Sequence, residues 1–269
     1  MLNDITLGQY FPGKSPIHQL DPRTKILGVV TYISTIFLAE DYLAYAILTA
    51  FAAMAVAVSR IPVSMVIKSI KPLWIIVLLT LAIHVFSTPG NVVVNLGPLA
   101  ATQEGIRMGT LMSLRLVLLI AVSSLLTFTT SPIALTDGIE RLLNPLRRVG
   151  VPAHELAMMM TIALRFIPTL LEETDRIMKA QMARGADFAS GNILKRAKNM
   201  VPLLVPLFIS AFRRADELAV AMEARCYRGG ENRTRMKELK IGKIDIGAAV
   251  TLVVLIAILV TVRAYKLAI

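Results

Sequence analysis

The stretch MGTLMSLRLVLLIAVSSLLTFTT, residues 108–130, is the longest apolar run of the sequence and contains a single charged residue, Arg115. The hydrocarbon layer of a bilayer needs about 20 consecutive apolar residues of helix, so this run predicts a transmembrane helix. Further runs have the same character, and the shorter ones could span a membrane with help from flanking residues. They lie near residues 26–39, 42–59, 72–87 and 244–262.

These runs predict an all-α integral membrane protein with about five transmembrane helices. The first four runs form an N-terminal membrane domain, residues 1–131, and the last forms a C-terminal transmembrane helix, residues 244–269. The segment between them, residues 132–243, is too long for a loop and too apolar for a linker. It predicts a cytoplasmic domain of long amphipathic helices that lie along or under the membrane.

Several helices are expected within this segment. The stretch SPIALTDGIERLLNPLRRVGVP predicts a short amphipathic helix. A long helix should run from Pro152 to Arg184 and end at Gly185, a residue type common just past a helix C-terminus. After a polar connection, a second long helix should run from about Pro202 to Arg225.

The chain of 269 residues carries a net charge of +11, which could indicate nucleic acid or a membrane surface as partner. The Lys and Arg residues fall between the apolar runs, so we assign them to the cytoplasmic face and expect no nucleic-acid partner. Lys14, Arg23 and Lys25 place the N-terminus in the cytoplasm. Arg263 and Lys266 would then lie outside, a modest violation of the same rule.

The stretch LDPRTK, residues 20–25, is interpreted as the start of the first span. Asp21 can cap the helix, and Arg23 and Lys25 can anchor it at the interface. A packing role against the long cytoplasmic helices is the alternative.

The sequence has no GxxxxGK[ST] and no HExxH, and its His and Cys residues are too few for a zinc site. We therefore expect no enzyme and no cofactor bound by this chain. Arg115, inside a span, should either serve a structural purpose or serve function directly. The structural alternatives are a pair with Glu40, Asp41 or Glu104, or a side chain that extends toward the outer face. The alternative functions are an intramembrane enzyme that uses Arg115, His84 or the cytoplasmic acidic residues, and a self-sufficient channel or carrier.

Two similar peptides, QMARGADF at residues 181–188 and MEARCYRGG at residues 222–230, stand at the expected ends of the long helices. A terminal Arg is favourable there by about 0.3–1 kcal/mol, because the last carbonyls carry partial negative charge. Two such endings also suit docking, since Arg offers a rigid fork of donors to carboxylates and carbonyls of a partner. Chance likeness and structural duplication both remain open. The candidate docking residues are Ala183, Arg184, Gly185, Ala224, Arg225 and Cys226.

Three stretches in this order resemble the transmembrane T component of energy-coupling factor (ECF) transporters. They are SPIHQLDPRTKIL (15–27), LRFIPTLLEETDRIMKAQMARGADF (164–188) and AMEARCYRGG (221–230). The likeness covers essentially the whole chain, and the last two stretches resemble the family's Ala-Arg-Gly coupling-helix motifs. Cys226 stands where Gly is the family form, which predicts against a left-handed turn at that position.

The resemblance implies a coupling subunit of an ABC-type importer in the bacterial plasma membrane, for uptake of a vitamin or metal ion. Such a subunit joins a small membrane-embedded S component, which captures the substrate, to two cytoplasmic ABC-type ATPases, which use the ATP. By the same resemblance, Arg184 would enter a groove on one ATPase and Arg225 the matching groove on the other.

Overall fold

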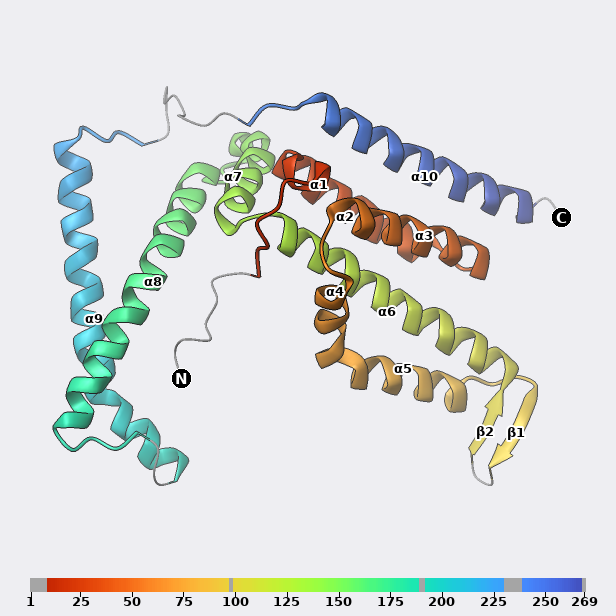
Figure 1. Ribbon diagram of the computed structural model, residues 1–269, viewed down its shortest axis with the longest axis horizontal. Coiled ribbons are helices and arrows are strands. Elements are labelled where there is room, and N and C mark those ends of the chain that lie inside the picture. The colour runs from red at the N-terminus through yellow and green to blue at the C-terminus, as the bar shows by residue number, and fades with distance from the viewer. Residues whose placement is uncertain (1–8, 97–98, 189–191, 230–238, 268–269) are drawn as a thin grey trace. The chain divides into compact units, whose positions relative to one another are not determined.

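The computed structural model describes residues 9–96, 99–188, 192–229 and 239–267 (Figure 1). Within these ranges the chain forms two compact units. Unit 1 holds residues 139–229, and unit 2 holds residues 9–138 together with 239–267.

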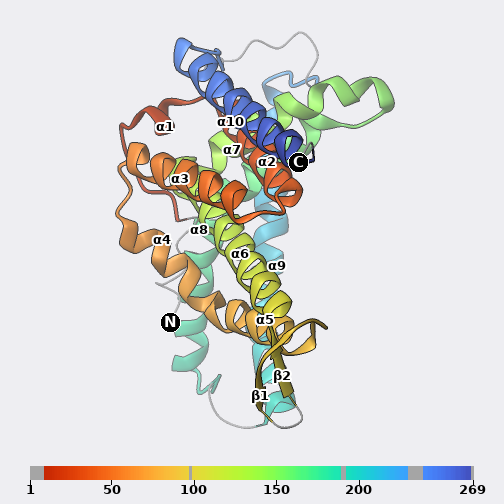
Figure 2. The same cartoon turned by 90° about the vertical axis from the view of Figure 1, so that its right-hand side faces the viewer.

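Unit 2 is built around one long helix, α6, against which α2, α3, α4 and α5 pack (Figures 1 and 2). The loop between the third and fourth expected spans contains a short antiparallel hairpin that the sequence did not indicate. The elements are α1 (Pro16–Gln19), α2 (Pro22–Leu38), α3 (Tyr42–Ser59), α4 (Val63–Ile70), the 3-10 helix η1 (Lys71–Leu73), α5 (Trp74–Ser87), β1 (Val92–Leu96), β2 (Leu99–Thr102), α6 (Gln103–Thr129) and α10 (Lys243–Leu267). The helix α7 (Pro132–Leu143) carries residues of both units.

Helices dominate the described chain, as the sequence predicts for an all-α membrane protein. Within the described residues, five helical stretches are long and apolar enough to cross a membrane. Four of them correspond to predicted spans: α3, the continuous stretch Val63–Ser87, α6, and Lys243–Tyr265 of α10.

The fifth stretch is not the one expected. The predicted span at residues 26–39 corresponds to α2, which has 17 residues and measures about 25 Å at 1.5 Å per residue. That length falls short of a hydrocarbon layer of about 30 Å. The stretch that qualifies instead is α8 (Ala153–Ala183), which the sequence analysis places in the cytoplasm and which is the least apolar of the five.

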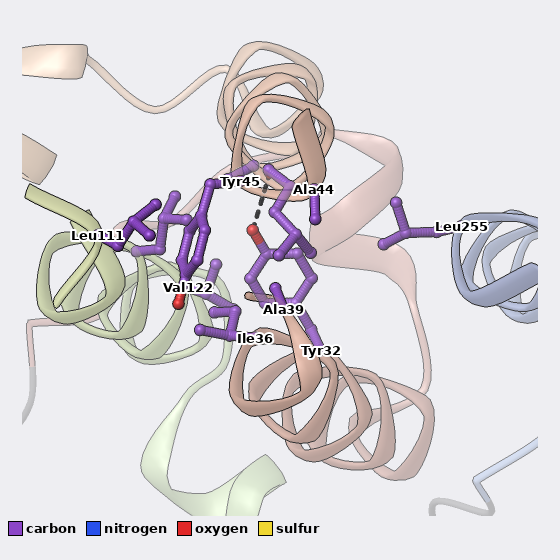
Figure 3. Packing of buried hydrophobic residues seen from close by; sticks show 11 residues of the cluster. Tyr32, Ile36, Ala39, Ala44, Tyr45, Leu111, Val122 and Leu255 are labelled. Atoms are coloured by element: carbon purple, nitrogen blue, oxygen red, sulfur yellow. Dashed lines mark hydrogen bonds between the residues drawn. The ribbon is translucent and has the colours of Figure 1, made fainter. Parts of the chain in front are cut away.

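The core of unit 2 joins side chains from α2, α3, α6 and α10 (Figure 3). Tyr32, Ile36 and Leu48 are fully buried there, and Leu255 of α10 points into the same cluster. The Tyr32 hydroxyl donates to the Leu48 carbonyl at 2.8 Å. This bond satisfies a polar group inside an apolar core and fixes the register of α2 against α3.

Arg115 is held by neutral groups. Its Nε donates to the Tyr45 hydroxyl at 2.9 Å, and its Nη2 donates to the Ala39 carbonyl at 3.4 Å. The guanidinium carbon also lies 5.2 Å from the Phe37 ring centroid, a cation–π arrangement. The prediction of a carboxylate partner was wrong, because the expected acids are engaged elsewhere. Glu40 contacts Arg263, Asp41 contacts Arg107, and Glu104 accepts from Asn91.

The start of α2 is capped as the sequence predicts. Asp21 is the N-cap, with Pro22 at the first helical position, and its Oδ1 accepts the Arg23 backbone N–H at 2.9 Å. The same carboxylate accepts two bonds from the Arg23 guanidinium, both at 3.1 Å. The cap and the ion pair therefore share one buried carboxylate.

Asp245 completes this region, and no sequence signal pointed to it. Its Oδ1 accepts the Asp21 backbone N–H at 2.8 Å, and its Oδ2 accepts the Gly242 N–H at 2.7 Å. Lys25, which is also buried, donates to the carbonyl oxygen of Thr129 at 2.9 Å. These charged groups tie the starts of α2 and α10 to the end of α6.

Candidate docking site at two helix ends

Unit 1 is dominated by two long helices, α8 and α9 (Ile193–Ala224). The expectation for α8 is confirmed to within a residue at each end, and Pro168 lies inside it. The prediction for α9 was wrong at its start, since the helix begins about ten residues before Pro202 and continues through Pro202 and Pro206. The residues before Pro202, ILKRAKN, include the good helix formers Leu, Lys, Arg and Ala, which favour a helix that begins before the prolines.

The two helices cross and run in opposite directions (Figure 1). Near the crossing, Arg214 Nη2 donates to Glu173 Oε2 at 3.0 Å. Closer to the end of α8, Gln181 Nε2 lies 3.5 Å from the Pro202 carbonyl oxygen. The end of α8 therefore lies beside the first part of α9, and the end of α9 lies beyond the crossing.

Both helices end in the same hydrogen-bonded turn, a Schellman motif. At the end of α8, the Ala186 N–H bonds to the Gln181 carbonyl at 3.0 Å, and the Gly185 N–H bonds to the Met182 carbonyl at 2.9 Å. At the end of α9, the corresponding bonds run from Tyr227 to Met222 at 3.0 Å and from Cys226 to Glu223 at 2.8 Å. Arg184 and Arg225 thus occupy the same place in the two motifs.

Cys226 adopts the left-handed backbone that the motif needs, with φ of 54°, and Gly185 does so with φ of 87°. The prediction that Cys226 would not form this turn was wrong. The two closing hydrogen bonds compensate for the steric cost of a side chain at positive φ, which is of order 1–2 kcal/mol.

We call residues Ala183, Arg184 and Gly185 the Arg184 tip, and residues Ala224, Arg225 and Cys226 the Arg225 tip. All six residues are exposed to solvent. Within the described chain, neither guanidinium forms a hydrogen bond or ion pair. Both are therefore available to an external carboxylate or carbonyl.

The structure keeps the two tips apart. Gln181, beside the Arg184 tip, contacts Pro202, and about 23 residues of α9 separate Pro202 from Arg225. At 1.5 Å per residue, the tips stand about 35 Å from each other. One small groove cannot receive both, so the arrangement fits two separate receptor sites.

Substitutions at the two left-handed positions test whether both helices end in Schellman motifs. Cys226→Gly is expected to stabilise the last turn of α9 by up to about 1 kcal/mol, and Gly185→Val to destabilise that of α8 by about 1–2 kcal/mol. Hydrogen exchange of the Tyr227 and Ala186 amides reports each turn separately. Equal exchange in both variants and the parent would contradict the assignment.

A hydrogen-bonded chain of side chains stands next to the Arg225 tip, and sequence reasoning missed it. Glu140 Oε1 lies 3.0 Å from His154 Nδ1, and His154 Nε2 lies 3.2 Å from the Tyr227 hydroxyl. The same hydroxyl lies 3.0 Å from Met158 Sδ. We call Glu140, His154 and Tyr227 the His154 bridge. It joins the end of α7, the start of α8 and the residue after the Arg225 tip.

The fold and site define a multi-pass α-helical membrane protein that presents two matched Arg-tipped helix ends. Comparison with known proteins agrees with this class. Residues 13–236 match the family model CbiQ, described as cobalt transport protein. The energy-coupling factor transporter transmembrane protein EcfT of Acidaminococcus fermentans is 64% identical over 263 residues, which is 98% of each chain. The protein of the same name from Bacillus subtilis is 49% identical over 265 residues, covering 98% of this chain and 100% of its own.

This chain therefore belongs to the family of transmembrane T components of ECF transporters. It is a transporter component, which is not an enzymatic role, and it acts with partner subunits.

Proposed function

We propose that this chain is the coupling subunit of an ECF-type importer, which transmits ATP-driven motion from two cytoplasmic ATPases to a substrate-binding S component. The observation that carries the proposal is the pair of identical turns that present Arg184 and Arg225. Each arginine is exposed at the end of a long helix, and the two stand about 35 Å apart. Two similar ATPases side by side would offer two similar grooves, one for each tip.

The middle of α9 provides a surface for the membrane-embedded partner. Its large apolar side chains recur every three or four positions, which places them on one face of the helix. Phe208 is 60% exposed and Phe212 is 67% exposed, a large apolar area for a helix outside lipid. The other members of this face are Val201, Leu204, Val205 and Ile209. In the proposed complex this face holds the S component, which captures a vitamin or metal ion.

The proposed orientation places both tips and the N-terminus in the cytoplasm, in the bacterial plasma membrane. The basic residues between the apolar helices support it, since such residues are retained on the cytoplasmic side. On this view α8 lies in the cytoplasmic domain, residues 132–243, despite its length. Its charged residues at Glu172, Asp175, Arg176 and Lys179 would be costly in hydrocarbon.

Affinity purification of the intact chain in mild detergent tests the proposal. We expect two nucleotide-binding polypeptides and one or more small hydrophobic proteins to co-purify with it. The measurement is identification and stoichiometry of the polypeptides by mass spectrometry. Substrate uptake by the purified chain alone in liposomes, without any ATPase, would instead establish a self-sufficient carrier.

A further inference from the structure

The two tips share one backbone motif but differ in the residue that follows it. In the Schellman motif of α8 this residue is Ala186, which has no polar side-chain atom, and in that of α9 it is Tyr227. Tyr227 reaches across to the start of α8 and bonds to His154. The Arg225 tip therefore has a side-chain tether that the Arg184 tip lacks at the equivalent position.

The tether acts where α9 has few other contacts. After the ion pair between Arg214 and Glu173, the last turns of α9 are largely exposed, and Val220 is 64% exposed. About 11 residues separate Arg214 from Arg225, an arm of about 16 Å. An arm that packs on little has low resistance to bending, so a bond at its far end fixes its direction.

The chemistry of the His154 bridge suits a fixed geometry. The Glu140 carboxylate can only accept, so His154 Nδ1–H donates to it. His154 Nε2 and the Tyr227 hydroxyl oxygen share a hydrogen bond, and the same hydroxyl contacts Met158 Sδ. The carboxylate thereby orients the imidazole, and the imidazole orients the tyrosine. Glu140 and His154 are both partly buried, with side chains 12% and 25% exposed, which limits competition from water.

We propose that His154 is a positioning residue for the Arg225 tip. By joining Tyr227 to Glu140 it holds the end of α9 in one direction, and it thereby sets the affinity of the ATPase that receives Arg225. The Arg184 tip docks independently of it. The statements about ATPase affinity and docking rest on the proposed function. The statement that the bridge fixes the direction of α9 concerns this chain alone and can be tested without any partner.

The first test uses Cys226, the sole cysteine of the chain and exposed in the structure. A nitroxide label on Cys226 reports the motion of the Arg225 tip in the detergent-solubilised full chain. We expect Tyr227→Phe, which removes one hydroxyl, and His154→Ala to increase label mobility. His154→Gln, which retains a donor and an acceptor, should restore part of the order.

The matched control moves the label to the other tip. Gly185 is the structural equivalent of Cys226, and a Cβ added there meets no atom within 4 Å. In a Gly185→Cys, Cys226→Gly chain, the label should not respond to Tyr227→Phe or His154→Ala. Unchanged mobility at Cys226, or equal changes at both tips, overturns the positioning role and indicates a general structural effect.

The second test measures binding of the nucleotide-binding polypeptides that co-purify with the parent chain. In an Arg184→Ala background, where only the Arg225 tip can dock, His154→Ala should weaken binding about tenfold. In an Arg225→Ala background it should have no effect. If no nucleotide-binding polypeptide binds the parent chain, the proposed function is refuted. Loss of binding with Arg225→Ala but not with His154→Ala refutes the positioning role.

Discussion

A chain that carries both Arg184→Ala and Arg225→Ala is expected to lose its ATPases on purification in mild detergent. A buried interfacial arginine typically contributes about 2 kcal/mol or more, a factor of about 30 in affinity. Sites that stand about 35 Å apart act independently, so each of the two ATPases should lose about 30-fold in affinity. The measurement is the amount of co-purified ATPase per chain, with ATP-dependent uptake as the second readout.

The matched control removes the same charge from the same helices. Arg176 in α8 and Arg213 in α9 are exposed and lie away from the tips. The Arg176→Ala, Arg213→Ala chain should retain its ATPases. Each tip variant alone should weaken one ATPase site and leave the other. Equal loss from the control pair would show that net positive charge, and not the two tips, recruits the ATPases.

Replacing Asp245 by Ala is expected to be the most destabilising single change in unit 2. Asp245 is 5% exposed and accepts two backbone N–H groups, from Asp21 and Gly242. Its removal leaves both donors unpaired and a buried positive charge at Lys25 without a nearby carboxylate of α10. Breaking a buried charged cluster on one side costs about 3–5 kcal/mol. The effect is measured as the temperature of unfolding in detergent, with the loss of monodisperse protein as the readout.

Two further variants define the cause. Asp245→Asn keeps one acceptor oxygen and should lose about half as much stability as Asp245→Ala. Asp216→Ala removes an exposed carboxylate of α9 and should change stability by no more than about 0.5 kcal/mol. If Asp245→Ala unfolds at the parent temperature, the starts of α2 and α10 are not held together by this carboxylate.

The features predicted from the sequence were those that depend on local pattern. Apolar runs long enough for a bilayer located α3, α5, α6 and α10, because span length is a property of a continuous segment. The cap at Asp21 and the end of α8 at Gly185 follow from residue types with strong local preferences. The Ala-Arg repeat located the ends of both long helices, although the left-handed turn at Cys226 was not predicted.

The features that were missed depend on contacts between distant parts of the chain. The pairing of Asp21 with Asp245 joins residues that are 224 positions apart, and nothing near either residue indicates it. The tyrosine of the His154 bridge lies 73 positions from His154. Arg115 was assigned an acidic partner because a charged side chain inside a membrane usually pairs with an opposite charge. The packed helices instead supply a hydroxyl, a carbonyl and an aromatic ring.

The crossing of α8 and α9 limits how a force applied at the end of one helix could reach the rest of the chain. A hydrogen-bonded helix is nearly inextensible, so neither α8 nor α9 can shorten when its two ends are pushed toward each other. The strain must appear as a change in the crossing angle of the two helices or as a bend at a proline. Prolines interrupt the backbone hydrogen bonds of both helices, at Pro168, Pro202 and Pro206. In the proposed complex, bending would therefore be concentrated in the interior of α8 and α9, away from the ends that would contact the ATPases.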